Sequence, residues 1–249
     1  MTQSVTVRVV KTQGSAPRDA GTVMQVFIDT QNGTIGGGAL EWEATRIART
    51  MLTGPKNQML RVFPLGPDLG QCCGGAVTLA FDRDVALGQA NRQPVWIWGA
   101  GHVGRAIAGV LQPTEAFDIT LIDTSASKLP DPMPQGVTPL VATDPVRVIP
   151  HAPENADHLV LTHSHDIDLA LCDGLLRHSV GSIGLIGSHT KWVRFQRRLG
   201  ALGHTGGEIS RIQCPIGDPA LGKHPHAIAI GVAAAMIRPD QTARKDKIA

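Results

Sequence analysis

VWIWGAGHVGRAIA, residues 95–108, is the stretch of this chain that decides its fold. Four apolar residues run directly into three glycines with the spacing G-x-G-x-x-G, and apolar residues then recur at helical intervals. This pattern predicts a buried strand, a tight turn and a helix. Gly99 permits the sharp turn, Gly101 lets a phosphate approach the backbone, and Gly104 lets the helix pack close to the strand. The free N–H groups of the first helical turn then point at an anion.

A second strand supports this interpretation. Residues 117–123, FDITLID, end on Asp123, which lies 24 positions after Gly99. Folds of this kind place a carboxylate near that position to bind ribose hydroxyls. A dinucleotide is therefore the default ligand, although the turn itself recognises phosphate geometry and not nicotinamide. The alternative is a turn that binds nothing.

Composition narrows the class of protein. The chain has 249 residues, of which 42% are apolar and 18% charged, as in ordinary globular proteins. A net charge of +2 is too small to indicate a nucleic acid or a membrane surface as partner, and aromatic residues are too few for base stacking. No signal peptide opens the sequence, and the longest apolar run near its end, residues 227–237, is too short to span a bilayer. We therefore expect a cytoplasmic protein.

The first part of the chain predicts a mixed α/β domain over residues 1–90. Its strands are expected at 5–10, 22–29, 59–63 and 76–81, with a hairpin turn at 31–33 and a helix that follows Gly38 and ends before Gly54-Pro55. A polar stretch that ends in Pro94 marks the domain boundary.

From Pro94 onward strands and helices alternate, which predicts a Rossmann-like domain with a parallel sheet over residues 94–249, including a C-terminal helix and a short tail. The expected strands are 94–98, 117–123, 137–142, 158–162 and 182–187, and the expected helices are 103–112, 166–177 and 189–200.

Four cysteines fall into two groups. Cys72 and Cys73 lie between glycines in a predicted loop, where a thiolate can ligate a soft metal or carry sulfur. The alternative is that they are two small apolar residues that start a strand. Cys172 and Cys214 are interpreted as structural. Adjacent cysteines are a poor start for disulfides and no C-x-x-C pair is present, so reduced thiols are expected.

Residues 162–168, THSHDID, follow a short apolar strand. They do not match the metallo-hydrolase pattern H-x-H-x-D-H. The carboxyl ends of parallel strands are nonetheless where ligands bind, so His163 or His165 is a candidate ligand contact. Asp166 is alternatively the N-cap of the next helix.

A second strand-to-helix turn lies at residues 184–191, GLIGSHTK. Ser188 is predicted to cap the helix, whose N-terminus is another anion site. Lys191, in the first turn beside Gly187, is expected to contact phosphate. Arg198 lies on the same helical stripe and is interpreted as part of a solvated basic face.

Together these segments resemble the xanthine dehydrogenase accessory protein family, the XdhC-type chaperones that hold molybdenum cofactor and deliver it to xanthine dehydrogenase and related hydroxylases. The resemblance runs through nearly the whole chain. Its most specific part is the Cys-Cys-Gly-Gly loop ahead of the glycine fingerprint. The motifs that carry it are residues 14–18 (GSAPR), 33–38 (GTIGGG), 70–75 (GQCCGG), 99–104 (GAGHVG), 184–188 (GLIGS) and 214–217 (CPIG).

The resemblance implies a cofactor-binding chaperone and not an enzyme. It implies an N-terminal α/β domain, a Rossmann-like domain, and molybdenum cofactor in the cleft between them. The cofactor is a pterin dithiolene that bears a phosphate. Its sulfur is implied to come from a cysteine desulfurase, and a homodimer is expected. Cys73, supported by Cys72, is expected to meet the molybdenum. The remaining residues expected to hold the cofactor are Gly99, Gly101, His102, Val103, Gly104, Asp123, His163, Gly187, Ser188 and Lys191.

Two other functions stay open at this point. In an NAD(P)-dependent oxidoreductase, Asp123 would bind the adenosine ribose, and His163 or His165 would move a proton. In a sulfur-transfer enzyme, Cys73 would turn over a persulfide.

Overall fold

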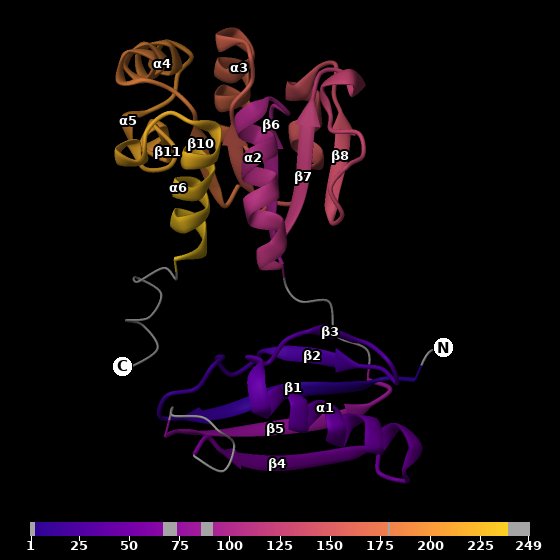
Figure 1. Ribbon diagram of the computed structural model, residues 1–249. Coiled ribbons are helices and arrows are strands. Elements are labelled where there is room, and N and C mark those ends of the chain that lie inside the picture. Colours follow the sequence, from indigo (N-terminus) through magenta and orange to yellow (C-terminus); the bar gives the residue numbers. More distant parts are fainter. Residues whose placement is uncertain (1–2, 67–73, 86–91, 179, 239–249) are drawn as a thin grey trace. The chain divides into compact units, whose positions relative to one another are not determined.

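The computed structural model describes residues 3–66, 74–85, 92–178 and 180–238 (Figure 1). The chain divides into two compact units, residues 1–90 and 91–249. Each unit is described by itself below.

The first unit is a five-stranded antiparallel sheet with the order β3-β2-β1-β5-β4 and one long helix. Alternate strand residues such as Val7 and Phe81 are fully buried in one cluster with Leu40 of the helix, so the helix covers one face of the sheet. The elements are β1 (Val5–Gln13), β2 (Val23–Val26), β3 (Gln31–Gly33), α1 (Gly38–Thr53), β4 (Gln58–Pro64) and β5 (Ala76–Arg83).

The hairpin in this unit differs from the prediction. Residues 31–33, expected as the turn, form β3 instead. The chain reverses one step earlier, where the Phe27 N–H donates to the Thr30 carbonyl at 2.9 Å. The Gln31 side chain is held by α1, because its amide nitrogen donates to Glu41 at 2.8 Å and its oxygen accepts from Thr45 at 3.1 Å. These contacts with a helix that follows in the chain hold Gln31 in the strand. A turn prediction based on neighbouring residues cannot detect them.

The second unit is a six-stranded sheet with the order β11-β10-β9-β6-β7-β8, and its strand pairs are parallel. This confirms the predicted fold class: a mixed α/β domain followed by a Rossmann-like domain. The strands are β6 (Gln93–Trp98), β7 (Phe117–Asp123), β8 (Val137–Val141), β9 (Asp157–Val160), β10 (Ser182–Leu185) and β11 (Ile212–Gln213). The helices are α2 (His102–Leu111), α3 (His165–Leu176), α4 (His189–Ala201), α5 (Gly206–Ile209) and α6 (Pro225–Ile237).

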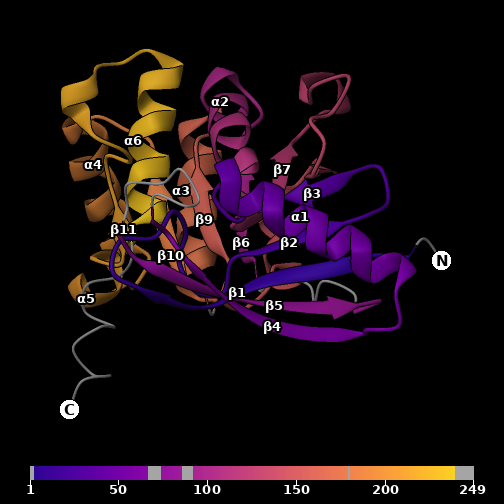
Figure 2. The ribbon, with the colours of Figure 1, turned by 60° about the horizontal axis from the view of Figure 1, so that its bottom comes forward.

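Alternation along β6 explains how both faces of this sheet are covered. Val95 and Ile97 belong to the core cluster of α2 and α6, whereas Trp96 and Trp98 belong to the cluster of α3 and α4. Figures 1 and 2 show α2 and α6 side by side. β6 is hydrogen-bonded to β7 on one side and to β9 on the other, so the strand order reverses there. In open α/β sheets, ligands bind at this reversal, beside the carboxyl ends of the strands.

A buried histidine contacts Trp98, the last residue of β6, at the carboxyl edge of the sheet. The Trp98 indole donates to His158 Nδ1 at 3.1 Å, and the two rings stack with centroids 5.9 Å apart. His158 is fully buried, and burial, followed by the neighbouring His178, lowers its pKa to about 4. The ring is therefore neutral at pH 7 and carries its proton on Nε2, an atom without a hydrogen-bond partner in the described residues. This pair fixes the orientation of Trp98 directly before the glycine turn.

None of the helices in the described residues combines the length and the apolar character needed to cross a bilayer.

Candidate functional site

The turn between β6 and α2 has the geometry that its glycine spacing predicts. Gly99 has a φ of 119°, which favours glycine, and a Cβ there would overlap the Leu161 backbone. A Cβ on Gly104 would overlap the Gly99 carbonyl oxygen well inside 3.0 Å. Helix and strand therefore approach as closely as their backbones allow.

Gly101 differs from Gly99 and Gly104 because its position has room for a side chain. It is the N-cap of α2 and its backbone is extended, with a φ of −70° that any residue adopts. A Cβ added there would meet nothing within 4 Å. No side chain caps α2, so the N–H groups that begin with His102 and Val103 have no side-chain acceptor at this cap. The open space in front of these groups suits an anion.

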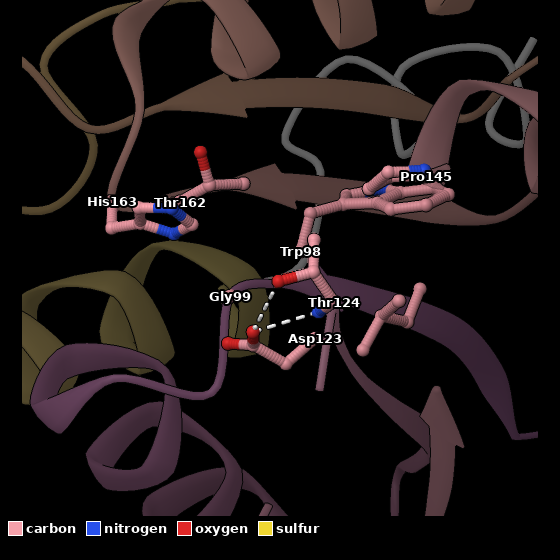
Figure 3. Close-up of a pocket in the computed structure, with 8 residues that line it drawn as sticks. Trp98, Gly99, Asp123, Thr124, Pro145, Thr162 and His163 are labelled. Carbon is pink, nitrogen blue, oxygen red and sulfur yellow. Dashed lines mark hydrogen bonds between the residues drawn. The ribbon is translucent and has the colours of Figure 1, made fainter. Parts of the chain in front are cut away.

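Asp123 is placed beside the turn, but its carboxylate already has partners. The side chain is about 6% exposed; Oδ2 accepts the Ala100 N–H at 2.8 Å, and Oδ1 accepts the Thr124 N–H at 2.7 Å. Figure 3 shows the bonds to Thr124. Burial raises the pKa of this carboxyl, but the hydrogen bonds from Ala100 and Thr124 outweigh it and lower the pKa overall. Asp123 thus holds the glycine turn in place and has little capacity left for a ribose diol.

A small pocket opens at this edge of the sheet (Figure 3). Its interior volume is only about 10 Å³, far below the roughly 300–1,000 Å³ of sites that enclose a ligand. It therefore has room for about one water-sized group. Its apolar walls are Trp98, Ile122 and Pro145, and its polar groups include Asp123, Thr162 and His163.

The structure separates the two candidate histidines. His163 lines the pocket, where its Nδ1 lies 3.3 Å from the Lys128 ammonium. His165 is the first residue of α3 and its ring stands edge-on to Phe195, with centroids 6.5 Å apart. The N-cap of α3 is Ser164, whose hydroxyl accepts the Ile167 N–H, and not Asp166.

Lys128 is the residue at this site that sequence reasoning missed. Its ammonium lies 3.5 Å from Asp123 Oδ1 and 3.3 Å from His163 Nδ1, so it bridges two polar groups of the pocket. The side chain is 43% exposed. The signal available in the sequence was a lysine five positions after a strand-terminal acid, which is weak because exposed lysines are common in such loops.

Lys191 lies in the first turn of α4 beside Gly187, as predicted, but protein groups engage its ammonium. Ser188 caps α4 as predicted, and its hydroxyl accepts the Lys191 N–H at 3.3 Å. The Lys191 ammonium, however, donates to Asp168 Oδ2 at 2.6 Å and to the Ile186 carbonyl at 2.8 Å. The Lys191 side chain is only 10% exposed and that of Asp168 is fully buried. A buried carboxylate needs a counter-charge, and Lys191 supplies it.

Gly187 serves packing in the structure. A Cβ there would press on the Lys191 side chain and on Cys214 Sγ. Cys214 is half-buried, and burial raises the pKa of its thiol. Cys172 is fully buried on α3, facing inward as predicted, and burial raises its pKa to about 12. Both thiols are therefore protonated at neutral pH. Cys72 and Cys73 lie outside the described residues, so their expected role stays a prediction.

The fold and the site define a protein of two compact units, the second of which carries a Rossmann-type glycine turn. Residues 95–236 match the model of the XdhC Rossmann domain, and residues 2–62 match that of the XdhC and CoxI family. The chain belongs to the XdhC family, which confirms the resemblance seen in its sequence motifs.

Two similar proteins illustrate this relationship. The uncharacterized protein YqeB of Escherichia coli K12 is 28% identical over 235 residues, which cover 93% of this chain and 42% of YqeB. The chain thus spans about two fifths of the length of this relative. A Bacillus halodurans protein, whose crystal structure is described as that of a xanthine dehydrogenase, superposes with a TM-score of 0.79 at 17% identity, covering 99% of this chain and 93% of that protein. At this identity the likeness shows the fold alone.

Proposed function

We propose that this protein binds molybdenum cofactor, supports its sulfuration and inserts it into xanthine dehydrogenase or a related molybdenum hydroxylase. Membership of the XdhC family carries the proposal, because family models match segments of both units of the chain. The protein acts as an accessory chaperone and not as a catalyst. A cysteine desulfurase supplies the sulfur, and the chaperone works as a homodimer.

The residues at the glycine turn fit the phosphate of this cofactor. The space in front of Gly101 is open, and the N–H groups of the first turn of α2 have no capping side chain. The small pocket beside the turn has apolar walls from Trp98 and Pro145, against which the edge of a flat heterocycle can pack. When bound, the cofactor would supply molybdenum and a dithiolene, and the chain would supply the anchor for its phosphate end.

The position of Asp123 bears on the NAD(P)-dependent alternative. A dinucleotide-binding enzyme needs a carboxylate free to accept both ribose hydroxyls. Asp123 is almost fully buried and accepts from Ala100 and Thr124. This arrangement favours a ligand that is held by its phosphate over one that is held by its ribose.

The direct test is the content of the purified protein. Protein produced in a host that makes molybdenum cofactor should carry molybdenum and a pterin, detected by metal analysis and by fluorescence after oxidation. Bound nicotinamide in place of pterin would contradict the proposal and support the oxidoreductase alternative.

Gly101→Asp should fold normally and lose the cofactor. The new side chain has open space, and aspartate is a preferred N-cap, so α2 should be at least as stable as before. The added carboxylate occupies the N–H groups that the phosphate needs and repels the phosphate itself. Molybdenum per chain after gel filtration should fall at least tenfold.

Gly109→Asp is the matched control, since Gly109 is exposed on the same helix and an added Cβ there also meets nothing within 4 Å. It should retain wild-type molybdenum. Normal cofactor content in folded Gly101→Asp would show that the turn is structural only.

Cys73→Ala should lose cofactor retention or sulfuration, because a thiolate is the protein ligand best suited to a soft metal centre. Cys172→Ala, at a fully buried thiol on α3, should lose at most about 1–2 kcal/mol of stability. The measurements are molybdenum per chain and activation of an apo-hydroxylase. Wild-type values for both Cys72→Ala and Cys73→Ala would mean that the cysteine loop has no part in the function.

A further inference from the structure

Arg105, Lys191 and Lys128 are cations near the carboxyl edge of the parallel sheet, and short hydrogen bonds hold the first two. Arg105 donates through Nε to the Ala100 carbonyl at 2.7 Å and through Nη2 to the Lys128 carbonyl at 2.5 Å. Lys191 is held at 2.6 Å by a fully buried Asp168. Neither can turn toward a ligand without leaving a buried or backbone acceptor unpaired.

Lys128, the third cation, is held loosely. Its ammonium is 3.5 Å from Asp123 Oδ1, longer than a direct hydrogen bond, and 3.3 Å from His163 Nδ1. The side chain is 43% exposed. Asp123 keeps its backbone hydrogen bonds from Ala100 and Thr124 if the lysine moves. No short hydrogen bond to the described residues holds the ammonium, so Lys128 can turn toward an anion while the Asp123 carboxylate keeps its two backbone donors.

Hydroxyl groups surround the same loop. Ser125 Oγ and Ser127 Oγ lie 2.9 Å apart, three positions and one position before the lysine, and Ser127 is exposed while Ser125 is partly buried. The Thr124 hydroxyl is directed to Asp123 at 3.3 Å. An ammonium and hydroxyl groups on one loop are donors that phosphate oxygens accept. The backbone of this loop is anchored to α2 through Arg105, so the set is fixed relative to the glycine turn.

We propose that Lys128 is the side chain that binds the phosphate of the ligand at the glycine turn, in place of Lys191. The phosphate replaces His163 as the partner of the ammonium. This inference rests on the proposed function for the identity of the ligand, whose phosphate is a monoester. The positive charge of Lys128 makes the site selective for an anion over the neutral diol of an unmodified ribose.

Titration calorimetry of the full chain with inorganic pyrophosphate tests this assignment. Lys128→Met should weaken pyrophosphate binding at least tenfold, because a charged hydrogen-bond donor is lost. Lys128→Arg keeps the charge and should stay within about threefold of wild type. Lys223→Met, at an exposed lysine of the same unit, is the control and should not change the affinity.

Two outcomes would overturn the inference: no binding of pyrophosphate by the wild-type chain, or affinity of folded Lys128→Met within twofold of wild type. The proposed function is tested separately by pterin content. A chain that binds pyrophosphate through Lys128 but never retains pterin would leave the inference standing and refute the cofactor assignment. If Lys128→Met retains wild-type pterin content and wild-type affinity for pyrophosphate, the role of Lys128 is refuted and the cofactor assignment stands.

Discussion

Gly104→Ala should destabilise the Rossmann-like unit by about 3 kcal/mol or more, although alanine favours helices over glycine. The added Cβ would overlap the Gly99 carbonyl oxygen and press on Leu161 Cδ1 at 3.0 Å. A backbone carbonyl in a tight turn cannot move aside as a flexible side chain does. Relief requires α2 to shift away from β6, which opens the core between them. Urea unfolding followed by tryptophan fluorescence measures the loss, since three of the four tryptophans lie in this unit.

Gly109→Ala on the same helix is the control for helix propensity. An added Cβ there meets nothing within 4 Å, so this variant should gain up to about 1 kcal/mol. Equal stability of Gly104→Ala and Gly109→Ala would mean that the close approach of α2 to the turn is not required.

Lys191→Met should cost about 3–5 kcal/mol, because it leaves the Asp168 carboxylate buried without its counter-charge. Asp168 is fully buried and the pair is separated by 2.6 Å. Adding Asp168→Asn removes the stranded charge while the amide oxygen still accepts from Thr162, so the double variant should recover much of the loss. Urea unfolding at pH 7 gives the three free energies.

Arg198→Met on the same helix provides the comparison. Arg198 pairs with Asp166 at 3.2 Å, but both side chains are more than half exposed, so the expected loss is below about 1 kcal/mol. If Lys191→Met costs no more than Arg198→Met, the Lys191–Asp168 pair does not stabilise the fold.

The amino-acid sequence alone established the glycine turn and the alternation of strands and helices in the Rossmann-like unit. The three glycines of residues 99–104 specify their turn. At Gly99 and Gly104 a Cβ would overlap neighbouring backbone atoms, and at Gly101 the missing side chain leaves space open. Alternation of apolar strands with amphipathic helices predicted the parallel sheet. The strands of such a sheet are buried on both faces, because helices cover each face of the sheet. β11 has only two residues and α5 only four, too few to show a periodicity, and both were missed.

Tertiary structure decided the chemistry of the candidate site. Lys128 meets His163 across 35 positions of sequence, and Lys191 meets Asp168 across 23. Sequence spacing placed Lys191 in the first turn of a helix and did not single out Lys128, and it could not show which acid each lysine faces. The burial of Asp168 engages Lys191, while the backbone bonds of Asp123 leave Lys128 loosely held. Charge pairing follows from burial and distance, and both arise only when distant strands of the sheet come together.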